Sequence, residues 1–321
     1  MHKVSIVIPV FNGSNYLSEA IDSALAQTYP NIEIVVVNDG SSDNGETERI
    51  ALSYGDKIRY FSKKNGGVAS ALNLAIEKMS GDYFSWLSHD DLYYPEKVET
   101  QTRALDGLAQ TKAILYGDHA VFFDNGMDAR EIHLPLVPPD QFRYFITVNN
   151  ILHGCTLLIP RAAFDECGRF NEALRTTQDY DLWFRMAEKY QFIHIPGALV
   201  KARSHAEQSS TKMKGTALKE INELLSGFVS KLSETELAAA AHGQTPSMAY
   251  AAIASNLRMR GFSEAAGVAN DLAWKNLGRN SVPEKLKCLA MLAQTRMAEV
   301  PMKFMRDALS ALRCKMKQGP R

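Results

Sequence analysis

Residues 4–43 read VSIVIPVFNGSNYLSEAIDSALAQTYPNIEIVVVNDGSSD, in which two apolar runs flank one amphipathic segment. Val4–Val10 and Ile32–Val37 are rich in β-branched residues, a composition typical of strands that are buried on both faces. Tyr16–Gln27 carries apolar residues at helical spacing between these runs. A buried strand, a helix and a second buried strand make a parallel βαβ unit, so the stretch predicts an α/β fold.

The same alternation continues beyond this stretch. We expect helices over Glu46–Tyr54, Val68–Met79 and Asp179–Tyr190, and strands over Ile58–Phe61, Tyr83–Ser88, Ala113–Tyr116 and Thr156–Ile159. The succession predicts a largely parallel sheet with helices on both faces. After about residue 212 the sequence is rich in Ala, Leu and Met at helical spacing. We therefore expect an α/β domain over residues 1–212 and an all-helical region over residues 213–321.

The composition excludes several classes of protein. The chain holds 36 Lys and Arg residues against 36 Asp and Glu residues, a balance that argues against general nucleic-acid binding. Its N-terminal apolar run is too short for a signal peptide and no stretch is long enough for a transmembrane helix, so we expect a cytoplasmic protein. The cysteines lack the CxxC spacing of a zinc site and are expected to be buried or incidental thiols. They are Cys155, Cys167, Cys288 and Cys314.

Polar clusters follow three of the predicted strands. Residues 11–13 read FNG, residues 38–43 read NDGSSD, and residues 88–91 read SHDD. In parallel sheets, ligands bind beyond the carboxyl ends of the strands, so these clusters predict one shared site.

The pair Asp90 and Asp91 places two negative charges side by side. Adjacent carboxylates repel each other unless they are solvated, hydrogen-bonded or neutralised by a cation. Together with Asp39 they suit a hard divalent cation, Mg²⁺ or Mn²⁺, whose shell the phosphates of a ligand complete. The alternative is that the pair caps a helix that follows it. GxGxxG and P-loop motifs are absent from the strand ends, and GxSxG and HExxH are absent too, so the corresponding nucleotide, hydrolase and zinc-protease sites are not expected.

Six segments, in order along the chain, carry a resemblance to a known family. They are residues 4–43 and the motifs NGGVASALN, WLSHDDLYYPEKV, GRFNEAL, QDYDLWFRMA and RSHAEQSS. With these motifs the chain resembles family 2 glycosyltransferases over roughly residues 3–212. The resemblance implies a GT-A fold, which is Rossmann-like with a mostly parallel mixed sheet, and an inverting transfer of sugar from a nucleotide-diphospho-sugar.

The resemblance also implies roles for individual residues. Asp179, in QDYD, would be the catalytic base that removes a hydroxyl proton from the acceptor. A position at the start of a helix favours its ionised form, although an ordinary N-cap looks the same and Asp181 is a competitor. The donor would be bound by Pro9, Phe11, Asp39, Asn65, Asp90, Arg203 and Gln208. Mn²⁺ or Mg²⁺ would be held by Asp91 and His205, and the acceptor would approach His153 and Asp181.

Within the donor site, Pro9 and Phe11 would line the nucleobase pocket. Asp39 would accept a hydrogen bond from the base, a choice that commonly goes with uracil or thymine. Two simpler interpretations stay open: Asp39 as an Asx-turn residue, and His153 as a side chain that fills a polar gap.

Three positions depart from the family pattern. Many relatives carry an acid at Ser88, an Arg at Leu72 and a Glu at Gln178. None of these changes removes Asp91 or Asp179, so the reaction type stands while the identity of the donor stays open, with UDP or dTDP sugars favoured.

We therefore expect a metal-dependent inverting glycosyltransferase that acts on a glycan or lipid-linked hydroxyl, in bacterial surface polysaccharide synthesis. A catalytically inactive binding or scaffold protein is one alternative, supported only by the missing acid at Ser88. A sugar nucleotidyltransferase is another, but it would normally show an Arg-containing phosphate loop where this chain reads PVFNGSNY.

The last segment, residues 302–321, combines apolar residues at helical spacing with several Lys and Arg residues. Three uses are open for this helix. It packs on the helical region, lies on an anionic membrane surface, or forms part of a homodimer interface.

Overall fold

The computed structural model describes residues 1–108, 112–123, 129–149, 151–205, 213–241 and 244–297. Within these residues the strands form two sheets, one of five strands and one of four. The helix predicted over residues 302–321 lies outside the described residues, and so does Gln208.

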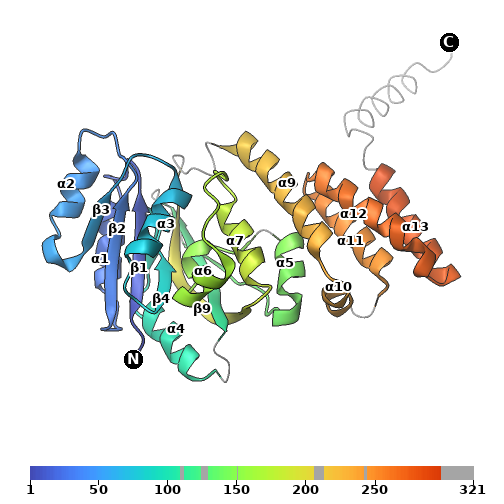
Figure 1. The fold of residues 1–321 in the computed structure, drawn as a ribbon, viewed down its shortest axis with the longest axis horizontal. Coiled ribbons are helices and arrows are strands. Elements are labelled where there is room, and N and C mark those ends of the chain that lie inside the picture. Colours follow the sequence, from blue (N-terminus) through green and yellow to red (C-terminus); the bar gives the residue numbers. More distant parts are fainter. Residues whose placement is uncertain (109–111, 124–128, 150, 206–212, 242–243, 298–321) are drawn as a thin grey trace, which may run out of the picture. The chain divides into compact units, whose positions relative to one another are not determined.

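The first sheet contains the βαβ unit predicted from residues 4–43 (Figure 1). Its strands run in the order β3 (Arg59–Ser62), β2 (Ile32–Asn38), β1 (Val4–Val10), β4 (Tyr83–Trp86) and β8 (Ile159–Pro160). The first four are parallel, and β8 pairs with β4 in the antiparallel direction. All seven residues of β1 are buried, as expected of a central strand that is covered on both faces.

Helices cover both faces of this sheet. α1 (Leu17–Leu25) and α2 (Glu46–Leu52) connect β1 to β2 and β2 to β3, so right-handed crossovers place both on one face. Leu17 and Ile21 of α1 pack in one core with the alternate residues Ile6 and Ile8 of β1. α3 (Val68–Lys78) runs back from β3 to β4, on the other side of β1, and so covers the opposite face. The predicted mixed, mostly parallel sheet between two helical layers is confirmed.

The second sheet was largely missed by the sequence pattern. Its order is β5 (Leu92–Tyr93), β9 (Gln191–Ser204), β6 (Ala113–Phe123) and β7 (Arg130–Ile132). β6 and β9 are parallel, and the register between them shifts after Gly117. Pro196 and Gly197 fall in that shift and interrupt the β pattern of β9, which explains why no strand was predicted there.

The remaining short elements differ from the prediction in detail. The strand predicted over Thr156–Ile159 lies later and is shorter: a 3₁₀ turn, η3 (Gly154–Thr156), precedes β8, which begins at Ile159. The helix predicted over Asp179–Tyr190 is α7 (Gln178–Met186), and it ends earlier. The other elements of this part are η1 (Gly55–Lys57), α4 (Lys97–Asp106), η2 (Pro139–Gln141), α5 (Phe142–Val148) and α6 (Arg161–Cys167).

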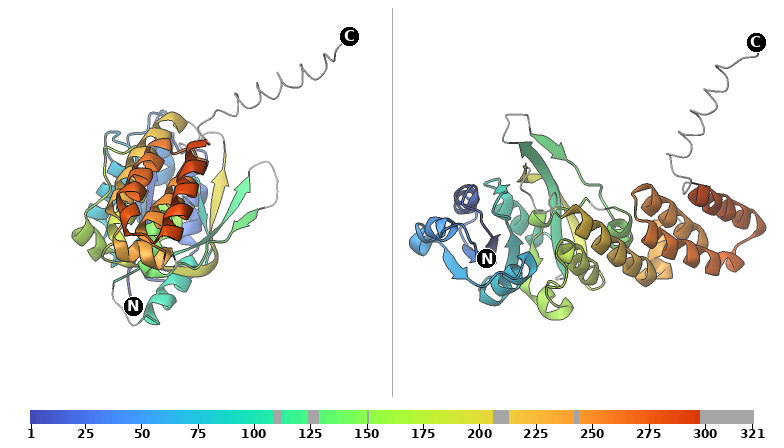
Figure 2. Two further views of the ribbon diagram at one scale, coloured as in Figure 1. Left: turned by 90° about the vertical axis from the view of Figure 1, so that its right-hand side faces the viewer. Right: turned by 90° about the horizontal axis from the view of Figure 1, so that it is seen from above.

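The C-terminal region is helical, as predicted (Figure 2). It contains α9 (Lys214–Lys231), α10 (Glu234–Ala240), α11 (Pro246–Met259), α12 (Ser263–Asn276), η4 (Leu277–Arg279) and α13 (Val282–Met297). α10 begins with a capping box between Ser233 and Glu236, and α11 begins with Pro246 at its first position, both typical helix starts.

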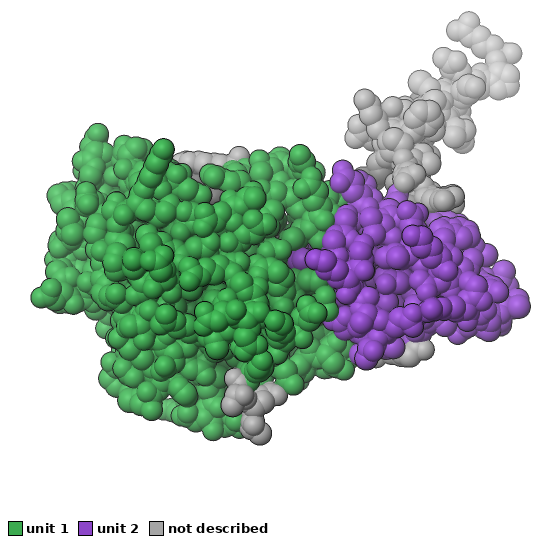
Figure 3. All heavy atoms as spheres, in the orientation of Figure 1, with its two compact units in different colours: residues 1–224 green, residues 225–321 purple. Residues whose placement is uncertain are grey.

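The chain divides into two compact units, residues 1–224 and residues 225–321 (Figure 3). The division falls inside α9, whereas the sequence pattern placed it between residues 212 and 213. The sequence pattern marks where the composition becomes typical of helices. The first half of α9 nevertheless belongs to the same compact unit as the α/β domain.

Candidate functional site

The carboxyl ends of β1, β2 and β4 meet at one edge of the first sheet, because these strands are adjacent and parallel. Phe11 follows β1 and is 45% exposed, while Pro9 is buried within the strand. Asp39 follows β2 and is buried. Asp90 and Asp91 lie in the connection between β4 and β5. The predicted clustering of polar groups at strand ends is therefore what the fold produces.

Asp39 binds the segment around Asn65. Its carboxylate accepts hydrogen bonds from the backbone N–H groups of Gly66 (3.0 Å) and Gly67 (2.7 Å), and it pairs with Lys63 Nζ at 2.9 Å. The Asx-turn interpretation of Asp39 is wrong, because these partners lie 24 to 28 residues away along the chain. Asn65 itself is exposed beside this carboxylate-bound loop.

Asp90 pairs with His205, the residue that follows β9. His205 Nε2 lies 3.0 Å from Asp90 Oδ2, and the two side chains are 12% and 15% exposed. The other ring nitrogen, Nδ1 of His205, is buried without a hydrogen-bond partner among the described residues. The rings of Tyr16 and His205 pack in an edge-to-face arrangement, with 5.1 Å between ring centroids.

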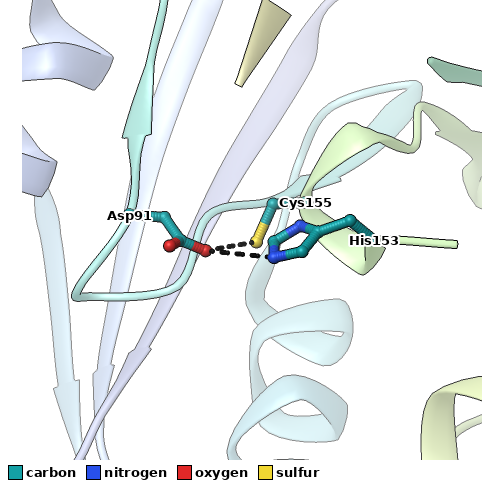
Figure 4. Close-up of side chains that lie close together, drawn as sticks. All are labelled: Asp91, His153 and Cys155. Atoms are coloured by element: carbon teal, nitrogen blue, oxygen red, sulfur yellow. Dashed lines mark hydrogen bonds and ion pairs between the residues drawn. The ribbon is translucent and has the colours of Figure 1, made fainter. Parts of the chain in front are cut away.

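Asp91 is the more deeply buried acid, with a side chain that is 5% exposed. Its Oδ1 accepts a hydrogen bond from the backbone N–H of Arg203 at 2.9 Å. Its Oδ2 lies 3.4 Å from Cys155 Sγ and 3.7 Å from His153 Nε2 (Figure 4). Burial and the neighbouring charge of Asp90 raise the pKa of Asp91 to about 7.

The helix-cap interpretation of the acidic pair is wrong. The two acids are followed directly by β5, and α4 begins only at Lys97, with Glu96 as its N-cap residue. The repulsion between the two adjacent carboxylates is therefore offset by other groups, among them His205 beside Asp90 and the backbone N–H of Arg203 on Asp91.

Arg203 holds the loop of the acidic pair in place through hydrogen bonds. Its backbone N–H binds Asp91, and its Nε donates to the backbone oxygen of Asp90 at 3.0 Å. Its guanidinium pairs with Glu19 at 2.7 Å and stacks over the ring of Tyr16, 4.2 Å from the ring centroid. The buried guanidinium thus positions the loop, whereas the sequence predicted a direct contact with the donor.

Asp179 lies in the first turn of α7, after the N-cap residue Thr177. Its Oδ1 accepts a hydrogen bond from the backbone N–H of Tyr180 at 2.8 Å, but burial outweighs this and raises its pKa to about 6. The start of the helix does favour the ionised form through backbone N–H groups, as expected, but burial has the larger and opposite effect on the pKa of Asp179. Asp181 is instead paired with Arg185, at 2.9 Å and 3.1 Å.

Two contacts that the sequence did not reveal fix the start of α7. The hydroxyl of Tyr180 accepts a hydrogen bond from the backbone N–H of Leu152 at 2.8 Å, which ties α7 to the segment that carries His153. Glu220 of α9 accepts hydrogen bonds from the backbone N–H groups of Arg175 (2.8 Å) and Thr176 (2.9 Å). No motif surrounds Glu220, and its only sequence signal is a carboxylate within an amphipathic helix.

Contacts join several of the predicted residues. Asp39 binds the Asn65 loop, Asp90 pairs with His205, Asp91 lies beside His153, and Arg203 contacts both acids. The predicted metal pair of Asp91 and His205 is not a direct contact, since the imidazole binds the neighbouring acid.

Comparison with known proteins defines the class. Residues 5–168, 164 of the 321 residues, match the family described as Glycosyl transferase family 2. The chain belongs to this family. It is 53% identical over 237 residues to an uncharacterized glycosyltransferase of Rickettsia felis, a match that covers 73% of this chain and 39% of the relative. The chain thus spans about two fifths of the length of that relative.

Two solved structures show the same GT-A type of fold. S. aureus TarS in complex with UDP-GlcNAc matches with a TM-score of 0.60 and 18% identity, over 91% of this chain and 81% of that chain. The mannosyltransferase PcManGT from Pyrobaculum calidifontis, in complex with GDP-Man and Mn²⁺, matches with a TM-score of 0.51 and 19% identity, over 95% of this chain and 88% of that chain. Within the described residues, no helix is long and apolar enough to cross a membrane.

The residues at the strand ends fit a divalent cation. Asp91 offers a buried carboxylate whose ionised form is disfavoured by burial and by Asp90, a penalty that a bound cation would remove. His205 offers a buried ring nitrogen that has no partner among the residues described. Oxygen and imidazole donors suit Mn²⁺, and Mg²⁺ would take the oxygens.

Proposed function

We propose that the chain is a metal-dependent inverting glycosyltransferase that moves a sugar from a nucleotide-diphospho-sugar to a hydroxyl group of a glycan or lipid-linked acceptor. Bacterial surface polysaccharide synthesis is the process in which such an acceptor would be met. The observation that supports the proposal is the adjacent pair Asp90 and Asp91 in the connection that follows β4, with Asp91 buried and Asp90 paired with His205.

The donor side is built from the strand ends. Phe11 and Pro9 would contact the nucleobase, and Asp39 would face it while anchored by Lys63 and the Asn65 loop. The position of Asp39 is rigid because both of its oxygens are held by the protein. Asp90, oriented by His205, would bind the ribose or the sugar, and Asp91 would hold Mn²⁺ or Mg²⁺ together with His205. When bound, the cation supplies positive charge that stabilises the leaving diphosphate.

The acceptor side depends on Asp179. The acceptor oxygen attacks the anomeric carbon, the bond from that carbon to the diphosphate oxygen breaks, and the hydroxyl proton passes to the Asp179 carboxylate. A pKa of about 6 leaves this carboxylate ionised at pH 7 to 8 and more basic than an ordinary Asp, which suits a general base. Asp181 is a weaker candidate because Arg185 holds its carboxylate.

The choice of nucleotide is a finer question. UDP or dTDP sugars are favoured by the role proposed for Asp39, and the TarS complex holds UDP-GlcNAc. The PcManGT complex holds GDP-Man, so guanine nucleotides belong in any test. A sugar nucleotidyltransferase has no support from the family match, and an inactive scaffold is the alternative that experiment must exclude.

The test is turnover of a panel of UDP-, dTDP- and GDP-sugars with Mn²⁺ or EDTA, followed through the released nucleoside diphosphate. We expect turnover with one nucleotide class only, and loss of turnover in EDTA. Asp179→Asn should lower the rate by roughly 10²–10⁴-fold while donor binding is retained. Asp181→Asn, two residues away on the same helix, is the matched control and should keep most of the activity. Unchanged turnover in Asp179→Asn would refute the assignment of the base, and no turnover or nucleotide binding with any donor would favour the scaffold.

A further inference from the structure

We propose that Asp91, His153 and Cys155 form a binding site for a thiophilic cation such as Zn²⁺, and that this ion inhibits the enzyme by occupying the carboxylate needed on the donor side. The binding of Zn²⁺ is independent of the proposed function, and only the inhibition rests on it.

The three side chains converge on one point from two separate segments (Figure 4). Their ligand atoms, a carboxylate oxygen, an imidazole nitrogen and a thiol sulfur, all lie within 4.8 Å of one another. Cys155 is buried and comes from η3, two residues after His153. Asp91 lies 64 residues earlier in the chain than Cys155. This separation explains why cysteine spacing alone predicted no zinc site.

The two distances from the Asp91 oxygen are close to those of tetrahedral coordination. With metal distances of about 2.0 Å to oxygen, about 2.05 Å to nitrogen and about 2.3 Å to sulfur, a tetrahedral ion separates oxygen from sulfur by about 3.5 Å and oxygen from nitrogen by about 3.3 Å. Asp91 Oδ2 lies 3.4 Å from Cys155 Sγ and 3.7 Å from His153 Nε2. These two separations need to change by only a few tenths of an ångström. The nitrogen–sulfur separation, which lies within 4.8 Å, would become about 3.6 Å in a tetrahedral site whose fourth position is left for water.

The chemistry of the donors selects the ion. The thiolate ligand favours Zn²⁺, whereas Mg²⁺ and Mn²⁺ favour oxygen ligands over sulfur. Ser88 supports the sulfur, since its backbone N–H lies 3.3 Å and its Oγ lies 3.4 Å from Cys155 Sγ. Such outer hydrogen bonds orient and stabilise a metal-bound thiolate. On binding, the thiol proton is released to solvent and the sulfur–metal bond forms, without any change of oxidation state.

The site shares one ligand with the proposed donor-side cation. An Asp91 carboxylate that binds Zn²⁺ beside Cys155 is directed toward η3 and is not available to a cation bound together with His205. Zn²⁺ should therefore act as a competitor of Mn²⁺, and the competition should depend on Cys155 although this residue has no part in the proposed reaction.

The first test uses Co²⁺, which replaces Zn²⁺ and reports thiolate ligation through a near-ultraviolet charge-transfer band. The wild-type chain should bind one equivalent of Co²⁺ with this band, and Zn²⁺ should displace it. Cys155→Ser should abolish the band, whereas Cys167→Ser, a half-buried cysteine outside the cluster, should retain it. A band that survives in Cys155→Ser, or no band in the wild-type chain, would overturn the proposed site.

The second test measures inhibition by Zn²⁺ of donor turnover supported by Mn²⁺. The Zn²⁺ concentration for half inhibition should rise with Mn²⁺ concentration, and it should be at least about tenfold higher in Cys155→Ser than in Cys167→Ser. Equal inhibition of the two variants would refute the inhibitory role. If the chain turns over no donor at all, the proposed function fails, and the cobalt spectrum still decides the metal site separately.

Discussion

Replacing the proposed catalytic base should make the protein more stable. Asp179→Asn removes an acid whose pKa burial raises from 3.8 to about 6, while the amide oxygen can still accept the hydrogen bond from the N–H of Tyr180. Because the folded-state pKa lies above the unfolded value, ionisation of Asp179 disfavours the folded state at neutral pH. The variant avoids that cost.

The magnitude follows from the shift. Each pKa unit corresponds to about 1.36 kcal/mol, so a rise from 3.8 to about 6 gives an upper value of about 3 kcal/mol. Below about pH 4 the acid is protonated in both states and the gain vanishes. It grows between about pH 4 and 6, where only the unfolded chain is ionised, and it is constant above about pH 7. For a unit of 224 residues, about 2–4 °C per kcal/mol converts the full gain to roughly 6–12 °C.

The assay is thermal unfolding of both proteins by calorimetry from pH 4 to pH 8. The variant should melt higher at pH 8, with a difference that shrinks toward pH 4. Asp181→Asn is the control, since it loses a half-exposed ion pair with Arg185 and should be slightly less stable than wild type. A variant no more stable than wild type at pH 8, or equally stabilised at pH 4, would refute the reasoning.

Two further substitutions test how buried carboxylates stabilise the fold and position α7. Burial alone would raise the pKa of Glu33, but hydrogen bonds from neighbours including Ser80 and Arg59 lower it to about 2. Glu33→Gln should therefore lower the free energy of unfolding, measured with urea at pH 7, by up to about 3 kcal/mol, and this loss should disappear as the pH falls from about 4.5 to 2. A loss that does not change with pH would contradict this prediction. Glu220→Ala should lower kcat by roughly tenfold with little change in donor affinity, because the carboxylate holds the backbone of Thr176 before α7. Glu220→Gln should recover part of the rate. If Glu220 has a purely structural role, the substitution would instead reduce the fraction of active enzyme.

The sequence predicted the parts of the fold that local pattern controls. The β-branched runs at Val4–Val10 and Ile32–Val37 became adjacent central strands, and the polar residues after them reached one edge. β9 escaped prediction because Pro196 and Gly197 break its alternation, and tertiary pairing with β6 holds it together. Local pattern carries no information about such long-range pairing.

The sequence names candidate site residues but not the contacts that they make. Asp39, Asp90, Asp91 and Asp179 lie in or beside motifs with clear spacing, and each occupies a buried or half-buried position. The partners that tune them are spread along the chain, so spacing could not reveal them. Asp91 Oδ2, for instance, lies 3.4 Å from Cys155 Sγ, although the two residues are 64 positions apart in the sequence. A lone cysteine or a glutamate in a helix gives no local signal of such a partner.

The central claim is that Asp91 holds a cation that binds the donor diphosphate, and calorimetric titration of UDP tests it most directly. The measurement compares wild type with Asp91→Asn, each with Mn²⁺ and with EDTA, and repeats the titration with dTDP and GDP. We predict that one nucleotide binds wild type at least about tenfold more tightly in Mn²⁺, and that Asp91→Asn loses this difference. Equal affinity in Mn²⁺ and EDTA, or a metal effect that survives in Asp91→Asn, would contradict the account.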